Sequence, residues 1–500
     1  MASSTYICAY SLIFFVGFVH GSTLTAPPLS VLVIGFESAY DLSLLANTLS
    51  DQGIDVTLVI PENIVDDLYE NIVDVEIYQL KDSRERSTNP DDNALKFCEI
   101  LFTDQNLANK IKEIQPAITV FPPLRHDGCL LPWIKMIDSM PVLLTRNGYE
   151  EMYTFERTNV ALPILKDVFL ARIVTNFEWI YLSSSIQNGL VKNSYNLAKK
   201  YVPDTELTKD TLYSDVRVVL WGSDTILRMN HASVTQMLLE IGCHHCRGPQ
   251  PLPGELQKSL IDYRLGTIVV LLNPYYKLLI EEVAQKLPQG RQGQAVVWKM
   301  RNAIFNKEEE LPKNLYLWYK IDRQDLIGNG RTRLVLSHCS DTELLEIIYH
   351  GSPVICFPRD HLEFKNAARA VQLGFAQLMD INNERMVIIS ENIVGFIKVM
   401  YASADYRENA RKISVALRDR LNPPSDKLIY WFRYIVRTKD DSEKFLDAPV
   451  NVNTLYEDFQ FFIGHCTGVL LGISITTAVL IIRYVIITER KQKSKGRYQR

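Results

Sequence analysis

Residues 334–375 of this chain read LVLSHCSDTELLEIIYHGSPVICFPRDHLEFKNAARAVQLGF. The apolar segment 334–337 predicts a buried strand, and a short turn leads from it into a helix that ends at Gly351 and Pro353. Residues 354–357 predict a second strand, which is followed by a second helix. A strand that leads directly into a helix presents free backbone N–H groups and the positive end of the helix dipole, an arrangement that often binds phosphate.

The same alternation of strand and helix extends along most of the chain. In the first half, Leu42, Leu45 and Leu49 lie on one face of a predicted helix, which Gly53 ends. Further strands are predicted at residues 30–36, 55–60, 118–121, 141–144, 216–220, 267–272, 295–299 and 315–318. The segment PQPLPGE at residues 249–255 predicts a linker. The sequence therefore predicts an α/β protein with two parallel sheets, each covered by helices on both faces.

Two apolar segments lie outside these sheets. The first ends in small residues, which predicts a cleaved signal peptide at residues 1–21. The second, residues 461–482, is long enough to cross a bilayer and precedes a basic tail at residues 483–500. This charge asymmetry predicts a single-pass type I membrane protein with its bulk in the lumen. An amphipathic or buried C-terminal helix is the alternative.

The composition allows two core-forming domains, since the 500 residues are 47% hydrophobic and 22% charged. The net charge of -4 gives no electrostatic reason to expect a nucleic-acid partner. A core of this size does not need disulfides, and the pairing of the cysteines stays open. The tetrapeptide Cys243-His244-His245-Cys246 contains metal-ligand residue types, but adjacent ligands cannot all surround one tetrahedral ion without strain, so no metal site is expected.

The residues His338, Glu346, Pro358 and Asn366-Ala367, together with the tetrapeptide HGSP at 350–353, form a pattern that resembles the donor-binding signature of the UDP-glycosyltransferase family. The resemblance covers nearly the whole predicted lumenal part. It implies two facing Rossmann-like domains of the GT-B type: residues 22–248 on the acceptor side and residues 266–455 on the UDP-sugar side, joined by a linker at 249–265. It also implies a UDP-sugar donor, no metal, small lipophilic acceptors, the endoplasmic reticulum membrane, and homo- or hetero-oligomers with family members.

The positions that the resemblance assigns to catalysis are changed. The family's catalytic histidine corresponds to Ser38, and its partner aspartate corresponds to Pro122. Neither side chain can take up a proton at neutral pH. Glu37 and Asp41 are candidate carboxylate bases, and Asp127 lies near the second position. Acidic residues at such turns are more often helix caps, so both interpretations remain open.

The donor positions differ as well. The resemblance places a uracil-stacking tryptophan and a glutamine at Lys320 and Arg323, and two glycines at Cys339 and Ser340. A cation does not replace a flat aromatic platform, although it can reach a phosphate. Ser340 and Glu343 form a capping box, in which the Ser340 hydroxyl accepts from the Glu343 N–H and the Glu343 side chain reaches back to Ser340. Such a helix has fewer donors free for a phosphate.

The remaining donor contacts follow the same pattern. His338 is a candidate donor to a phosphate. The family's sugar-binding Asp-Gln pair corresponds to Leu362 and Glu363, and Asp360 is a substitute if the loop shifts. Glu346 occupies the place of a ribose-binding carboxylate, and the alternative is an ordinary exposed helix residue.

Three functional hypotheses follow. The first is a divergent, glucuronosyltransferase-like transferase with weak or lost transfer of a hexosyl or glucuronosyl group, a possible pseudoenzyme. The second is an active hexosyltransferase that uses Glu37 or Asp41 as the base and Lys320 or Arg323 on the diphosphate. The third is a non-catalytic protein that binds lipophilic molecules or pairs with active family members.

Overall fold

The computed structural model describes residues 29–36, 39–81, 87, 89–123, 125–145, 191–207, 212–213, 215–227, 238–300, 311–379, 386–439 and 453–497. The predicted signal peptide and the candidate positions Glu37 and Ser38 lie outside these residues.

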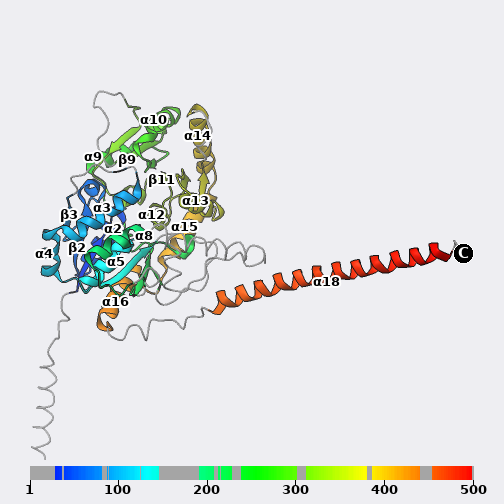
Figure 1. Ribbon diagram of the computed structural model, residues 1–500. Helices are drawn as coiled ribbons and strands as arrows, with labels where there is room; N and C mark the ends of the chain where they lie inside the picture. Colours follow the sequence, from blue (N-terminus) through cyan, green and yellow to red (C-terminus); the bar gives the residue numbers. More distant parts are fainter. Residues whose placement is uncertain are drawn as a thin grey trace, which may run out of the picture.

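The N-terminal half forms a seven-stranded parallel sheet in the order β3-β2-β1-β4-β5-β6-β7 (Figure 1). The strands are β1 (Ser30–Ile34), β2 (Asp55–Pro61), β3 (Glu76–Leu80), β4 (Ile118–Phe121), β5 (Met140–Thr145), β6 (Val218–Trp221) and β7 (Leu238–Glu240). The strand order reverses between β1 and β4. In doubly wound sheets, ligands bind beyond the carboxyl ends of the strands at this point.

Helices cover both faces of this sheet. They are α2 (Ala39–Ser50), α3 (Pro90–Thr103), α4 (Gln105–Ile114), α5 (Asp127–Met136) and α8 (Lys192–Tyr201), with short turns η1 (Glu62–Asp67) and η3 (Thr225–Leu227). Side chains of β1 alternate between the two faces: Leu32 packs in the same core as Phe97 of α3, whereas Val33 packs in the core that contains Leu45 of α2. Both faces are apolar, which explains why β1 is a continuous hydrophobic run.

The C-terminal half repeats this plan with a six-stranded parallel sheet in the order β10-β9-β8-β11-β12-β13. Its strands are β8 (Thr267–Val270), β9 (Ala295–Lys299), β10 (Leu315–Trp318), β11 (Thr332–Ser337), β12 (Val354–Cys356) and β13 (Ala376–Leu378). Its helices and turns are α9 (Gly254–Ile261), η4 (Pro274–Tyr276), α10 (Lys277–Lys286), η5 (Gly290–Gln292), α11 (Arg323–Ile327), α12 (Asp341–Tyr349), α13 (His361–Gln372), α14 (Met386–Ala402) and α15 (Asp405–Arg418). The strand order reverses between β8 and β11.

The last helix of the folded part, α16 (Pro424–Arg437), belongs to the core of the first sheet (Figure 1). Leu428, Phe432 and Ile435 are fully buried there with Leu45 of α2. This helix lies within the sequence range assigned to the C-terminal domain, yet it packs on the N-terminal one. The chain therefore crosses between the two halves twice.

A single long helix, α18 (Asn453–Arg497), follows (Figure 1). Its segment 466–488 has a mean hydropathy of 2.2, and its length and composition suit a membrane span. The predicted span at 461–482 overlaps this segment.

The structure confirms the predicted fold class of two parallel α/β sheets. Strands β4, β9 and β10 have the predicted bounds, while β3, β7 and β13 were not predicted from the sequence. Three disulfides join Cys98 to Cys129, Cys243 to Cys246 and Cys339 to Cys356. The size of the core gave no reason to expect them, but a lumenal location would favour their formation.

Candidate functional site

The two halves meet where the central strands of both sheets end. Helix α2 follows β1 and helix α12 follows β11, and the N-termini of these helices are joined by a hydrogen bond of 2.6 Å from Oγ1 of Thr342 to Oδ1 of Asp41. A second bond of 2.7 Å runs from Oγ of Ser223, after β6, to Oδ1 of Asp341 in the first turn of α12. The region that the sequence assigned to the donor is therefore an interface between the two sheets.

A buried ion pair lies at the centre of this interface. Glu346 is completely buried, and its Oε1 accepts from Nη2 of Arg323 at 2.8 Å and from Nε2 of His245 at 2.9 Å. Its Oε2 accepts from Nε of Arg323. The guanidinium of Arg323 also stacks over the ring of Tyr40, 4.4 Å from its centroid. Both carboxylate oxygens of Glu346 are thus engaged by side chains of the protein, in contrast to the ordinary exposed glutamate that was the alternative.

The ion pair fixes the charge of both residues. Burial alone would raise the pKa of Glu346, but Arg323 and His245 beside it bring that pKa below its usual value. Burial opposes the charge of Arg323 in the same way, yet Glu346 raises the pKa of the guanidinium well above its usual value. A positive and a negative group therefore stay ionised together inside the interface.

A second polar cluster lies beside the first. Asp322 accepts from Oη of Tyr69 at 2.5 Å and from Nη2 of Arg247 at 2.8 Å, and Arg247 also donates to Asp325 at 2.7 Å. Burial, with a contribution from Asp322, raises the pKa of Tyr69 to about 12. Arg247 follows the Cys-His-His-Cys tetrapeptide directly, so this cluster joins the segment after η1, the residues just before the predicted linker, and α11.

The turn between β11 and α12 is closed by its own hydrogen bonds. Nδ1 of His338 lies 2.9 Å from the carbonyl oxygen of Phe357, and its Nε2 accepts from the backbone N–H of Asn273 at 3.3 Å. Because both ring nitrogens are engaged by the backbone and the side chain is buried, His338 is not available to a phosphate in this state.

The predicted capping box forms in part. Oγ of Ser340 accepts from the N–H of Glu343 at 3.4 Å. The Glu343 carboxylate does not reach back to Ser340 but accepts from Oγ of Ser337 at 2.7 Å. Cys339, which directly precedes Ser340, has a left-handed backbone with φ of 62°, the conformation that favours glycine. This explains why a glycine suits that position in the family pattern.

The predicted sugar contacts form a small cluster of their own. Asp360 caps α13 by accepting from the N–H of Glu363 at 2.8 Å. Glu363 is buried and accepts from the backbone N–H and the guanidinium of Arg359. Lys320 is exposed at the end of β10 and does not join the interface cluster with Arg323. Arg323 and Glu346 thus form the buried pair, Asp360 and Glu363 form a separate cluster with Arg359, and Lys320 is exposed.

Among the catalytic candidates, Asp41 alone lies at the interface within the described residues. Pro122 directly follows β4 and is half-buried. Asp127 is fully buried at the start of α5 and accepts from Oη of Tyr213 at 2.8 Å. Asp127 therefore has a hydrogen-bond partner in its own half of the chain.

Sequence reasoning missed four members of the interface: Tyr40, Tyr69, His245 and Arg247. His245 was noticed only as part of the Cys-His-His-Cys tetrapeptide. The contacts of these residues join positions more than 70 residues apart along the chain, and no local pattern signals them. Two acidic residues close to Arg323 in the sequence, Asp322 and Asp325, were the one local signal that this segment pairs with a basic side chain.

A family model described as UDP-glucoronosyl and UDP-glucosyl transferase matches residues 61–497. The chain belongs to this family. A UDP-glucosyltransferase 2 from Dactylopius coccus is 23% identical over 365 residues, which are 68% of this chain and 67% of that protein. Human UDP-glucuronosyltransferase 1A8 is 22% identical over 428 residues, which are 81% of this chain and 76% of that protein.

Solved structures agree with the family on the fold. A UDP-glucosyltransferase from Polygonum tinctorium, capable of glucosylating indoxyl and crystallised with 3,4-dichloroaniline, has a TM-score of 0.55 at 14% identity, covering 83% of this chain and 99% of its own. The glycotransferase of kitacinnamycin has a TM-score of 0.55 at 12% identity, covering 81% and 99%. This family member therefore has the two-domain GT-B architecture, and its C-terminal apolar helix fits membrane anchoring.

Proposed function

We propose that this UDP-glycosyltransferase family member is a membrane-anchored protein of the secretory lumen that has lost, or strongly reduced, sugar transfer by the family's own residues. Its role is then to bind small lipophilic molecules or to pair with active family members. The observation that carries the proposal is the state of Glu346. At the place where the resemblance puts the ribose, this carboxylate is fully buried, and Arg323 and His245 use both of its oxygens.

The cost of opening this arrangement supports the proposal. A ribose that binds Glu346 has to displace Arg323 or His245, and breaking a buried charge pair without a substitute costs about 3–5 kcal/mol. Binding of UDP at micromolar affinity supplies about 8 kcal/mol in total. The closed pair would therefore consume a large share of the donor's binding free energy.

The uracil and diphosphate positions support it further. Arg323, which stands where the family has glutamine, is committed to Glu346 and to the ring of Tyr40. Both ring nitrogens of His338 are bonded to the backbone. Of the residues expected to hold the donor, Lys320 is exposed, and it offers no aromatic face for a base to stack on.

An active hexosyltransferase is the second candidate, and Asp41 favours it. This carboxylate lies in the first turn of α2, three residues after Ser38, where the family's base is expected, and accepts from Thr342 in the first turn of α12. In this case Asp41 would take the acceptor proton, with residues 22–248 forming the acceptor side and residues 266–455 the UDP-sugar side.

The deciding measurement is the thermal unfolding of the full-length protein in detergent with 1 mM UDP, together with transfer from UDP-glucose and UDP-glucuronic acid to a panel of phenols. A ligand at a hundred times its dissociation constant stabilises a protein by about 2.7 kcal/mol. We expect no shift and no transfer, while an active family member run in parallel shows both. A clear UDP shift with turnover that Asp41→Asn abolishes would establish the second candidate instead.

The matched variant is Lys320→Trp with Arg323→Gln, which restores the two residue types expected for uracil binding. We expect this double variant to gain a UDP-dependent shift. If it folds and gains none, the loss of donor binding does not arise at these two positions.

A further inference from the structure

The Cys243–Cys246 disulfide differs from the other two in its surroundings. Cys98, Cys129, Cys339 and Cys356 are all 0% exposed, whereas Cys243 is 9% exposed and Cys246 is half-buried. The two cysteines of each other bridge are 31 or 17 residues apart in the sequence, whereas Cys243 and Cys246 are 3 residues apart. A bridge that closes a short loop restricts the unfolded chain less, so its reduction costs the fold less.

A cavity gives access to this disulfide from one side. The cavity has a volume of about 420 Å³ and lies between α2, the turn after η1 and the linker. Cys246 lines it, and so do Asn47, Asp51, Tyr69, His244 and Arg247. Cys243 does not line it. The two sulfur atoms are therefore unequal, and an attacking thiol meets Cys246 first.

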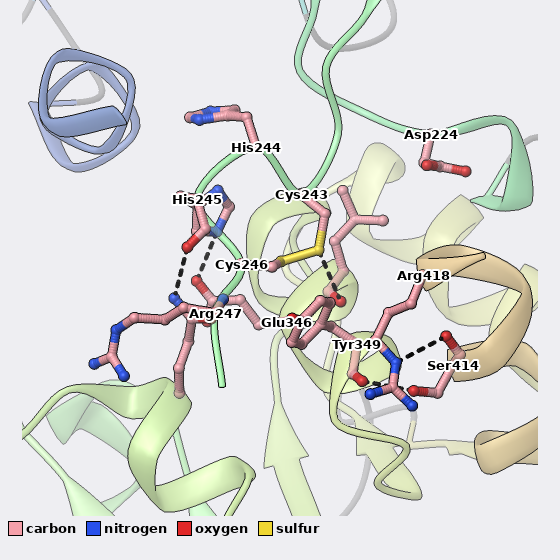
Figure 2. The surroundings of a disulfide bond; sticks show 12 residues. Asp224, Cys243, His244, His245, Cys246, Arg247, Glu346, Tyr349, Ser414 and Arg418 are labelled. Atoms are coloured by element: carbon pink, nitrogen blue, oxygen red, sulfur yellow. Dashed lines mark hydrogen bonds and ion pairs between the residues drawn. A yellow bond between two sulfur atoms is a disulfide. The ribbon is translucent and has the colours of Figure 1, made fainter. Parts of the chain in front are cut away.

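The sulfur of Cys243 lies next to a backbone hydrogen-bond acceptor. Sγ of Cys243 lies 3.7 Å from the carbonyl oxygen of Leu345 in α12 (Figure 2). Once reduced, the Cys243 thiol can donate to this oxygen without leaving its buried position. The turn is also tightly packed, because a Cβ at Gly242 would come within 2.5 Å of the carbonyl oxygen of Ser223.

The disulfide also holds the turn that carries His245. His245 lies between the two cysteines in the sequence, and Figure 2 shows it to one side of the disulfide, with its Nε2 bonded to Glu346. Its Nδ1 is buried and has no hydrogen-bond partner among the described residues. Besides the closed turn, the Glu346 contact and an edge contact with the ring of His244, with centroids 5.0 Å apart, hold this imidazole. Opening the turn would remove one of the hydrogen bonds that hold the Glu346 carboxylate.

We propose that Cys243 and Cys246 form a thiol–disulfide exchange site that accepts two electrons from a dithiol entering through the cavity, and that reduction releases His245 from Glu346. A thiolate of the dithiol attacks Sγ of Cys246, the bond between Cys246 and Cys243 breaks, and Cys243 leaves as a thiolate that takes up a proton. The second thiolate of the reductant then attacks the reductant's first sulfur, which is bonded to Cys246 in the mixed disulfide. Cys246 leaves as a thiolate, and the dithiol becomes a disulfide.

The first test equilibrates the full-length protein with defined ratios of reduced to oxidised dithiothreitol, with a chelator present. Differential alkylation and mass spectrometry then give the reduced fraction of each bridge. We expect Cys243–Cys246 to be half-reduced at a ratio at least about tenfold lower than the other two bridges, which serve as internal controls. Reduction of all three bridges together, or of this one last, would overturn the proposal.

Two single variants test the order of attack. In Cys243→Ser, Cys246 is left as a free thiol lining the cavity, and in Cys246→Ser, Cys243 is left buried against Leu345. We expect the first variant to react with oxidised glutathione at least about tenfold faster than the second. Equal rates would contradict the inequality of the two sulfurs.

The release of His245 is measured by hydrogen exchange in peptides that cover α12. Mild reduction, and equally the double variant Cys243→Ser with Cys246→Ser, should speed exchange in α12 relative to α4, which lies on the N-terminal sheet. The double variant separates loss of the bridge from other effects of the reductant. Unchanged exchange in α12 would show that the bridge does not govern the ion pair.

Discussion

Arg323 and Glu346 are both inside the protein, and each keeps its charge because the other is there. Such a pair adds little net stability compared with apolar residues of the same size, since both groups lose their water. Removing one partner costs more than removing both, because it leaves the other charge buried without a counter-charge. The pair therefore fixes the geometry of the interface more than it stabilises the fold.

Glu346→Gln should lower the free energy of unfolding by about 3–5 kcal/mol, because it leaves the Arg323 guanidinium buried without a counter-charge. The double variant Arg323→Met with Glu346→Leu should lose less than the single variant, because no buried charge is left unpaired and only the ring N–H of His245 loses its acceptor. The control is Glu206→Gln, which removes an exposed partner of Lys135 worth at most about 1 kcal/mol. Thermal unfolding in detergent measures all three. Equal losses in the single and double variants would contradict the account.

A second effect at this scale concerns His126. Burial among the rings of Phe36 and Phe97 lowers the pKa of His126 to about 3. The unfolded chain binds this proton below about pH 6.5, and the folded chain does not, so the stabilisation present above that pH is lost as the pH falls. The loss amounts to about 1.4 kcal/mol per pH unit.

The variant His126→Leu should remove this contribution, so its stability should fall less steeply than that of the wild type between pH 6.5 and pH 4. Unfolding by urea at several pH values measures the two slopes. Parallel pH profiles would show that His126 does not stay neutral in the fold.

At the scale of elements, the turn between β11 and α12 shows how one backbone position is constrained twice. Cys339 has a left-handed φ of 62°, and its sulfur is bonded to Cys356 of β12. A residue with a Cβ pays about 1–2 kcal/mol for that conformation, whereas glycine does not. The disulfide holds the turn where the conformational preference of cysteine would oppose it.

Two variants without this bridge separate the effects. Cys339→Gly with Cys356→Ala should be more stable than Cys339→Ala with Cys356→Ala, by about 1 kcal/mol. Glycine relieves the strained φ, and its greater freedom in the unfolded chain offsets only part of that gain. Denaturation of the two proteins under identical conditions gives the difference. Equal stability would mean that the turn relaxes once the bridge is absent.

The sequence predicted the central strands well because each is an apolar run that is buried on both faces, as at β1, β4 and β9. The edge strand β3 is mostly exposed and polar, so it lacks that signal. The cap at Ser340 could be predicted because Glu343 follows it by three residues, the spacing of a capping box. The ion pair of Arg323 with Glu346, and the contact of Tyr69 with Asp322, depend on how the two sheets meet, which no local pattern encodes.

At the scale of the whole molecule, the two sheets are joined by side chains from both. Lys299 of the second sheet pairs with Glu70 of the first, and Arg420, before α16, pairs with Asp224. Helix α18 stands apart from this body, with an apolar segment at residues 466–488.

Truncation after residue 452 should release the protein from membranes, because it removes the apolar helix. Truncation after residue 488 keeps the apolar segment and deletes only the polar, mostly basic end of the tail, residues 489–500, so this control should remain in the membrane fraction. Sedimentation after an alkaline wash measures both. Retention of the shorter protein would show that another segment anchors the chain.

The position of α16 has a consequence for the order of events during synthesis. The first sheet emerges early, but the helix that covers Leu45 and its neighbours is among the last parts of the folded body to be made. At roughly 5–20 residues per second, translation of the second sheet takes on the order of ten seconds or more. During that time one side of the first sheet keeps an apolar surface uncovered. We therefore expect this apolar surface to be accessible on the nascent chain until α16 has been made.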